Sequence, residues 1–166
     1  MSKKASVFTV VICIIGIISS LFFTGFMFVQ FFSIKTNTQT ITELNRTYHG
    51  SVLNITATDI KTIDDSLNKD GICIAVRFVI ENKSDTDFRM GGSLINPYVD
   101  DITADGDTYA FFNEPGEGLN GTIAPGKSSV GYYSIHASKD AKVVEIQIKE
   151  SSNTKVIFVF NVPSAD

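Results

Sequence analysis

The protein has 166 residues, with 14 Lys and Arg against 18 Asp and Glu, and a formal net charge of −4. All eighteen acidic residues and twelve of the basic ones lie in residues 35–166, which therefore carry a net charge of −6. This acidic balance, without a basic patch, excludes nucleic acid from the expected partners and argues against attachment to an anionic lipid surface.

The first predicted element is a transmembrane helix over residues 5–34. This run of thirty residues has no charged side chain and is preceded by Lys3 and Lys4, whereas a bilayer core of about 30 Å needs only about 20 apolar residues. The alternative is a cleaved signal peptide, whose apolar region is about 7–15 residues and ends at a small-x-small site. Because the run exits through Phe-Phe-Ser-Ile at 31–34, we interpret it as an uncleaved single-pass anchor.

The basic residues before the helix set its expected orientation. Residues 1–4 form a short cytoplasmic tail under the positive-inside rule, and the C-terminal part is then extracytoplasmic. Residues 35–47 are polar and Thr-rich, which predicts a stalk between the membrane and a domain over residues 48–166.

Beyond Tyr48 the hydrophobic residues alternate with a period of two. Residues 71–82 place Ile72, Ile74 and Val76 on one face, and residues 143–149 alternate in the same way. Turn residues separate these segments, and Asp105-Gly106 predicts a hairpin. The expected strands are Ser51–Ile60, Gly71–Asn82, Leu94–Ile102, Thr108–Asn113, Ser129–His136, Val143–Lys149 and Val156–Val162. About seven short strands predict an all-β, Ig-like antiparallel β-sandwich.

Two stretches of sequence carry a resemblance to a known group. One runs Val-Arg-Phe-Val-Ile-Glu-Asn-Lys-Ser over residues 76–84, and the other runs Ile-Ala-Pro-Gly-Lys-Ser over residues 123–128. With Asp105-Gly106 and Tyr109 between them, they resemble the small exported Ig-like domains of unknown function in Gram-positive surface proteins and lipoproteins. That group includes the mycobacterial immunoprotective extracellular protein. The resemblance implies the fold and a cell-surface location, and no catalytic site.

The resemblance also bears on anchoring and modification. Many members of the group are lipoproteins, but no lipidation cysteine ends the uncharged run here, so the helix is the expected anchor. Asn-x-Ser/Thr sequons occur at Asn45, Asn54, Asn82 and Asn120. A bacterial host, which the resemblance implies, would leave them unmodified.

The densest acidic cluster is the candidate metal site. Asp101, Asp105 and Asp107 fall near a glycine in a pattern similar to a calcium loop, but Phe112 stands where the bidentate Glu is needed. Turn residues explain the same sequence, so calcium is kept only as the weaker interpretation.

The Gly-rich loop at residues 113–121 is the candidate partner surface, because loops at the end of a sandwich carry variable contacts. Its candidate contact residues are Glu114, Gly116, Glu117, Gly118 and Asn120. Its two glutamates could serve as the acid and base of a glycosidase, but a loop without rigid support seldom holds such geometry.

No other catalytic pattern is present in the sequence. The two histidines, His49 and His136, have no Cys or His at metal-binding spacing. Ser134 lies too close to His136 for a triad, and no Gly-x-Ser-x-Gly motif occurs. Cys73 is interpreted as a partly buried strand residue. We therefore predict no catalysis and no cofactor.

Three functional hypotheses follow. The first is a membrane-anchored binding or accessory module that recognises a protein or a cell-wall ligand. The second is a subunit of a cell-envelope membrane complex, whose helix would contact partner helices through Gly16, Ser19 and Ser20. The third is a metal-dependent or hydrolytic surface enzyme that uses the acidic loops.

Overall fold

The computed structural model describes residues 37–64, 70–91, 94–106, 118–119 and 121–164. Residues Thr36–Asp166 form a compact unit of their own. The predicted membrane segment at 5–34 lies outside the described residues. Within the described ranges, no helix has the length and apolar character needed to cross a membrane.

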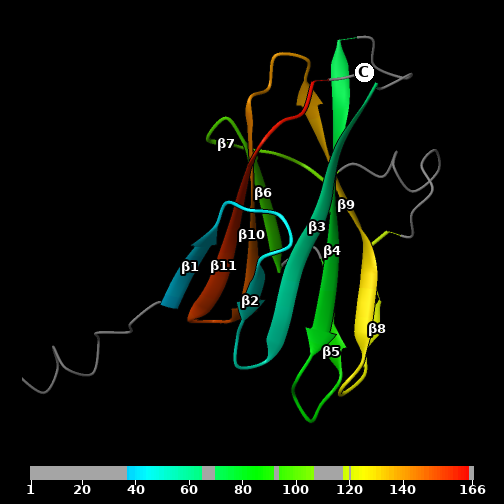
Figure 1. The fold of residues 1–166 in the computed structure, drawn as a ribbon, viewed down its shortest axis with the longest axis vertical. Helices are drawn as coiled ribbons and strands as arrows, with labels where there is room; N and C mark the ends of the chain where they lie inside the picture. Colours follow the sequence, from blue (N-terminus) through cyan, green and yellow to red (C-terminus); the bar gives the residue numbers. More distant parts are fainter. Residues whose placement is uncertain (1–36, 65–69, 92–93, 107–117, 120, 165–166) are drawn as a thin grey trace, which may run out of the picture. The chain divides into compact units, whose positions relative to one another are not determined.

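The strands form two main sheets that face each other as a sandwich (Figure 1). The first sheet has the order β1 (Asn37–Ile41), β11 (Thr154–Asn161), β10 (Val143–Ser151), β6 (Ile95–Val99) and β7 (Ile102–Thr103). The second has the order β2 (Thr47–His49), β3 (Leu53–Asp64), β4 (Gly71–Asn82) and β9 (Ser128–Ser138). A small third sheet pairs β5 (Phe88–Arg89) with β8 (Thr122–Ile123). The predicted all-β sandwich is confirmed for the described residues.

The core lies between the inner faces of the two sheets. From β4, Ile74 and Phe78 are fully buried, and Ile146 and Phe158 of the opposite sheet are buried against them. The rings of Phe78 and Phe158 meet edge to face, with centroids 5.2 Å apart. Such aromatic pairs stabilise a core beyond the area that they bury. The alternation read from the sequence therefore identifies the inward-facing positions of β4 and β10.

Part of the segment predicted as a stalk, residues 35–47, forms strands of the sandwich. Asn37–Ile41 forms β1, which pairs in parallel with β11, and β2 begins at Thr47. The first four residues of β1 are exposed, and only Ile41 is buried. A strand whose side chains mostly face water shows no alternation of polarity, so its sequence is that of a polar linker.

A β-bulge at Thr58 divides β3 into two halves. The register passes from Ala57↔Phe78 to Asp59↔Arg77, which leaves one extra residue on β3. Because side chains alternate with a period of two, one inserted residue exchanges the inward and outward positions. Leu53, Ile55 and Ala57 therefore face the core below the bulge, and Ile60 faces it above.

A tight hairpin lies at Asp100-Asp101, within the strand that was expected over Leu94–Ile102. Both aspartates have positive φ angles, 48° and 67°, and Val99 pairs with Ile102 across them. This geometry is that of a two-residue type I′ turn. Gly106 forms a bridge with Ile135 of β9. The strand expected at 108–113, which the hairpin predicted at Asp105-Gly106 would require, lies outside the described residues.

Candidate functional site

Asn82 joins the two sequence stretches that carried the family resemblance. Its side chain is fully buried, and its amide group donates to the carbonyl oxygens of Thr86 and Ile123, both at 2.8 Å. Its carbonyl oxygen accepts from the backbone N–H and the hydroxyl of Ser84. Every hydrogen-bonding position of this amide is therefore used to connect the end of β4 to the turn that follows it and to β8.

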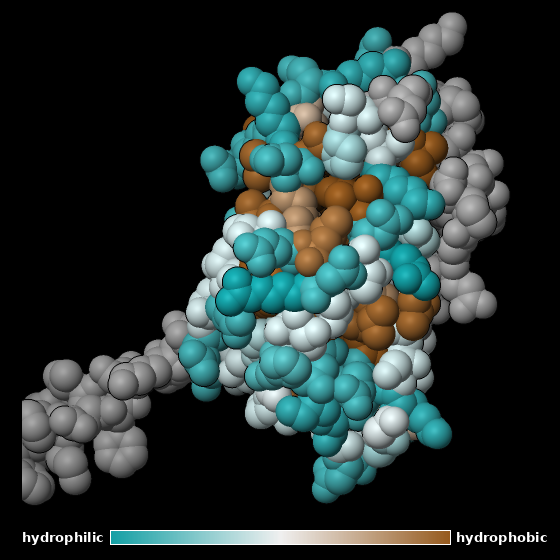
Figure 2. All heavy atoms as spheres, viewed as in Figure 1, coloured by the Kyte–Doolittle hydropathy of each residue, from teal (hydrophilic) through white to brown (hydrophobic). Residues whose placement is uncertain are grey.

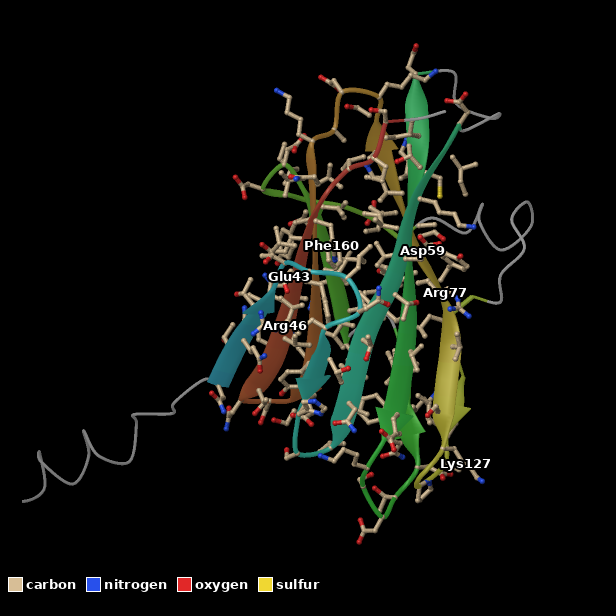
Figure 3. All side chains as sticks on the ribbon, in the orientation of Figure 1. Glu43, Arg46, Asp59, Arg77, Lys127 and Phe160 are labelled. Carbon is tan, nitrogen blue, oxygen red and sulfur yellow. The ribbon has the colours of Figure 1, made fainter. Side chains whose placement is uncertain are left out.

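The backbone of Asn82 extends the same junction. Its N–H donates to Lys127 at 2.9 Å, and its carbonyl accepts from Gly126 at 2.8 Å. Figure 3 labels Lys127 at the end of the sandwich where this turn lies. Gly126 has φ 68°, a left-handed conformation that favours glycine. The hydrogen bonds of Asn82 thus give the two stretches that carried the resemblance a structural role, as a joint between the end of β4 and the turn before β9. Because its side chain is buried and fully hydrogen-bonded, the Asn82 sequon is closed to modification in the folded chain.

The acidic turn is organised by backbone hydrogen bonds. Asp100 accepts from the N–H groups of Lys142 at 3.1 Å and Val143 at 2.9 Å, so it caps the start of β10. Asp101 and Asp105 are exposed, and Asp107 lies outside the described residues. In the described part of the chain, no group of three His, Cys, Asp or Glu side chains could hold a metal ion.

Only the end of the candidate partner loop is described. Gly118 bridges Tyr132 of β9, and the N–H of Leu119 donates to the carbonyl of Tyr132 at 2.8 Å. Leu119 is buried. Glu114, Gly116, Glu117 and Asn120 lie outside the described residues. The loop therefore rejoins the sandwich along the outer edge of β9.

A buried carboxylate at Glu150 is the main polar feature that the sequence did not reveal. It lies at the end of β10 and is 6% exposed. It accepts from the Tyr48 hydroxyl at 3.0 Å, from the N–H of Leu53 at 2.7 Å, and from the N–H of Val52. A carboxylate with several donors is a strong acceptor, so Glu150 ties β10 of one sheet to β2 and β3 of the other.

Gly50 is required by this arrangement. A Cβ atom at this position would overlap the Glu150 carboxylate and would lie 2.6 Å from Cε1 of Tyr48. Such a contact is far inside van der Waals distance, so any larger residue would displace the network. Burial, followed by the hydrogen bond to Glu150 and the charge of its carboxylate, raises the pKa of Tyr48 to about 12. The phenol therefore stays protonated and remains a donor.

A polar cavity of about 170 Å³ opens beside this network. It is lined by Asn37, Gln39, Tyr48, His49, Gly50, Ser51, Glu150 and Thr154. His49 Nδ1 is 3.2 Å from Oδ1 of Asn54, which turns the imidazole along β3. Both carboxylate oxygens of Glu150 already accept hydrogen bonds from Tyr48, Val52 and Leu53. The hydrogen-bond network around Glu150 therefore serves chiefly to join the two sheets.

The serine and histidine residues considered for a triad are not brought together for catalysis. On β9, Ser134 is buried and His136 is exposed. Cys73 is buried and pairs with His136 across the β4–β9 ladder. Burial, with a further contribution from the charge of Asp105, raises the pKa of Tyr133. None of these groups lines the cavity beside Glu150.

The strand order and the core contacts described above define the chain as a β-sandwich protein. Solved structures of other proteins have a similar fold. No family model matches the sequence, and no curated protein matches it. The fold is similar to that of ycdA, a candidate lipoprotein of Bacillus subtilis, with a TM-score of 0.58 and 16% identity. The match covers 72% of this chain and 39% of ycdA, so this chain corresponds to less than half of that protein.

Two further structures match over most of their own length. An uncharacterised β-sandwich protein of Clostridium difficile has a TM-score of 0.50 and 13% identity, over 77% of this chain and 96% of its own. MPT63, a secreted protein of Mycobacterium tuberculosis, has a TM-score of 0.51 and 14% identity, over 74% and 95%. At these identities the likeness establishes a shared β-sandwich fold alone.

Proposed function

We propose that the protein is a membrane-anchored, extracytoplasmic binding or accessory module at the cell surface and that it performs no catalysis. The observation that carries this proposal is the junction between the two parts of the chain. The uncharged run ends at Ile34, and β1 begins at Asn37. A sandwich that begins this close to an uncharged run of membrane-spanning length is a domain for use at a membrane surface.

The strand order supports the finer, Ig-like assignment within this proposal. The order β11-β10-β6-β7, with β1 parallel to β11, fits one sheet of an Ig-like sandwich, and β3, β4 and β9 fit the other. The similarity to a secreted protein and to a candidate lipoprotein supports export of the domain.

The partner surface in this proposal comprises the loop at 113–121 and the outer edge of β1. In the described part of the chain, β1 pairs with β11 on one side only. An edge strand offers unpaired backbone N–H and C=O groups to another extended segment. A protein or cell-wall peptide can therefore be bound without any catalytic group.

The proposal is tested by pull-down of the full chain from detergent-solubilised membranes. A partner should be recovered with the wild type and lost with Glu114→Ala/Glu117→Ala. Asp85→Ala/Asp87→Ala, a matched acidic pair exposed in the turn after β4, should retain it. Recovery of no partner from membranes would count against a binding role.

A helix exchange separates this function from that of an envelope-complex subunit. Replacing residues 5–34 with an unrelated membrane helix should leave partner recovery unchanged, because the sandwich makes the contact. Loss of the partner after the exchange would assign the contact to the helix, where Gly16, Ser19 and Ser20 lie. The anchored-subunit hypothesis would then replace the binding-module proposal.

A further inference from the structure

The space between the two sheets becomes polar at one end of the sandwich. Along β1, Asn37, Gln39 and Ile41 point to the same side of the strand, and only Ile41 is buried in the core. Along β10, the buried position that follows Ile148 is occupied by Glu150. Figure 2 shows hydrophilic and neutral side chains over β1 and β2, with apolar ones further up the same face. Polar residues at core-facing positions break the pattern of a strand, and such breaks are typical of functional sites.

The cavity beside Glu150 lies at this polar end. β1 is the edge strand of one sheet and β2 is the edge strand of the other, and both strands line the cavity, together with Glu150 of β10 and Thr154 of β11. Its volume is about 170 Å³. Because a cavity of about 150 Å³ can hold benzene, this one has room for a group of about six non-hydrogen atoms. That is the size of one side chain and not of a nucleotide or an oligosaccharide.

The carboxylate of Glu150 brings a negative charge into the cavity wall. Its Oε1 accepts from the N–H groups of Val52 and Leu53, and its Oε2 accepts from the hydroxyl of Tyr48, which also lines the cavity. A carboxylate oxygen has about two acceptor positions, so Oε2 retains one for a further donor. All three donors are neutral groups. The charge of this buried carboxylate is therefore stabilised by hydrogen bonds but is not balanced by a cation.

The basic groups near the cavity do not supply that cation. Lys83 Nζ donates to the carbonyl of Gly50 at 2.9 Å and is not part of the cavity wall. His49 is part of the wall, and its Nδ1 lies 3.2 Å from Oδ1 of Asn54. Within the described residues, no Lys or Arg side chain lines the cavity. Buried charges in proteins are normally paired, so the cavity is suited to a cation from another molecule.

We propose that this cavity binds the primary ammonium group at the end of a short alkyl chain. An ammonium group has three donors and no acceptor. One donor would meet the free position on Oε2 of Glu150, and the others would meet the side-chain oxygens of Asn37, Gln39 or Thr154, which line the same cavity. The alkyl chain would leave between the edges of β1 and β2.

The wall of the cavity favours an ammonium group over two other cations. A guanidinium group binds a carboxylate best as a fork that uses both oxygens, but Oε1 already accepts two hydrogen bonds. A calcium ion takes about 6–8 oxygen ligands, usually with several carboxylates, whereas Glu150 is the one carboxylate among the described residues of the wall. A single remaining acceptor position matches a compact donor such as ammonium.

This inference stands apart from the proposed surface function, because it is tested on the purified full chain in a nonionic detergent, without a membrane partner. Binding of n-butylammonium is followed by saturation-transfer NMR. We expect saturable binding with a Kd of about 1–10 mM, as suits so small a ligand. The neutral n-butanol, of equal size, and n-propylguanidinium should each bind at least about tenfold more weakly. Equal binding of either compound, or no saturation below about 100 mM n-butylammonium, would overturn the proposal.

A lysine placed in the cavity wall provides the matched pair of variants. Gln39→Lys brings the chain's own ammonium group to the cavity and should weaken n-butylammonium binding at least about tenfold. Thr38→Lys makes the same change of charge at the neighbouring exposed residue of β1, whose side chain points to the opposite face. It should bind as the wild type does. Because both positions are exposed, both variants should fold, and equal affinities of the two would contradict the proposed site.

Glu150→Gln tests the carboxylate itself. The variant keeps the size of the side chain and an oxygen for the N–H groups of Val52 and Leu53, but its amide nitrogen has no acceptor position to offer. We expect the affinity for n-butylammonium to fall at least about tenfold, in protein whose circular dichroism shows a folded sandwich. Unchanged affinity in the folded variant would overturn the proposal, and the Gln39→Lys comparison decides the matter if this variant does not fold.

A peptide distinguishes the two sources of such a group, a free amine and a lysine side chain. Acetyl-Thr-Lys-Thr-amide presents the ammonium group from an extended segment, which can also pair with the open edge of β1. Affinity at least equal to that of n-butylammonium would assign the cavity to a lysine side chain of a peptide. Weaker binding of the peptide would assign it to free amines. Either result supports the ammonium site, provided that Gln39→Lys abolishes the binding observed.

Discussion

Replacing Glu150 with alanine removes the carboxylate that joins the end of β10 to β2 and β3. The carboxylate is buried and accepts three hydrogen bonds, from Tyr48, Val52 and Leu53. Alanine leaves two backbone N–H groups and one hydroxyl without their acceptor. The packing of Tyr48 against the same site is also loosened, because the carboxylate fills the space above Gly50.

The magnitude follows from the cost of leaving buried donors unpaired, which is about 1–3 kcal/mol for each group. The neighbouring polar cavity of about 170 Å³ admits water to part of the site, so values at the lower end of the range apply. Three donors then cost about 3–4 kcal/mol in the free energy of unfolding. For a domain of this size, such a loss lowers Tm by about 10–15 °C.

Thermal unfolding of the full chain in mild detergent, followed by circular dichroism of the β-sheet band, measures this loss. Glu145→Ala is the matched control, because Glu145 lies on the same strand, is only half-buried and accepts a hydrogen bond from Gln147. We expect the control to stay within about 0.5 kcal/mol of the wild type. A Glu150→Ala protein that melts within 3 °C of the control would refute the role assigned to this network.

Three further predictions concern other contacts. The pKa of Tyr48 is about 12 in the folded chain and about 10 when unfolded, so unfolding releases a proton between these pH values. Stability should therefore fall by about 1.4 kcal/mol per pH unit from pH 10 to 12 relative to Tyr48→Phe, and parallel pH profiles of the two proteins would contradict this. Asn82→Asp keeps the acceptor but loses both buried donors, which should cost about 3 kcal/mol in urea unfolding; a loss below 1 kcal/mol would argue against the joint. Asp101→Gly relieves a positive φ angle of 67° and should raise stability by about 0.5–1 kcal/mol; a lower Tm would contradict the type I′ assignment.

The two-residue periodicity of the sequence was sufficient to predict the strands whose apolar side chains face the core. In β10, and in β4 from Val76 onward, buried residues alternate with more exposed ones, as the pattern predicts, whereas residues 71–76 of β4 are all buried. The same reasoning failed for β1, because four of its five residues face water and its pairing with β11 is a long-range contact. A polar edge strand has the composition of a linker, and only tertiary pairing distinguishes the two.

Neither the bulge at Thr58 nor the hydrogen-bond network at Glu150 could be predicted from the sequence, for related reasons. A bulge adds one residue without a distinctive composition, so the change of inward face within β3 is visible only in the register with β4. Glu150 reads as a surface acid at the end of a strand, and its donors lie 97 to 102 residues away in the chain. The turn at Asp100-Asp101 was assigned to a strand, because Asp-Asp lacks the glycine that marks most type I′ turns.

The proposed export of an anchored domain is tested most directly by cysteine labelling in intact cells. Ser152 lies exposed in the turn between β10 and β11, and Ser152→Cys in a Cys13→Ser chain places a reactive thiol there while Cys73 stays buried. With the full chain in a Gram-positive host, an impermeant maleimide should label the membrane-bound protein before the cells are broken. Labelling only after lysis would place the domain in the cytoplasm and contradict the proposal, and labelled protein found only in the medium would refute the permanent anchor.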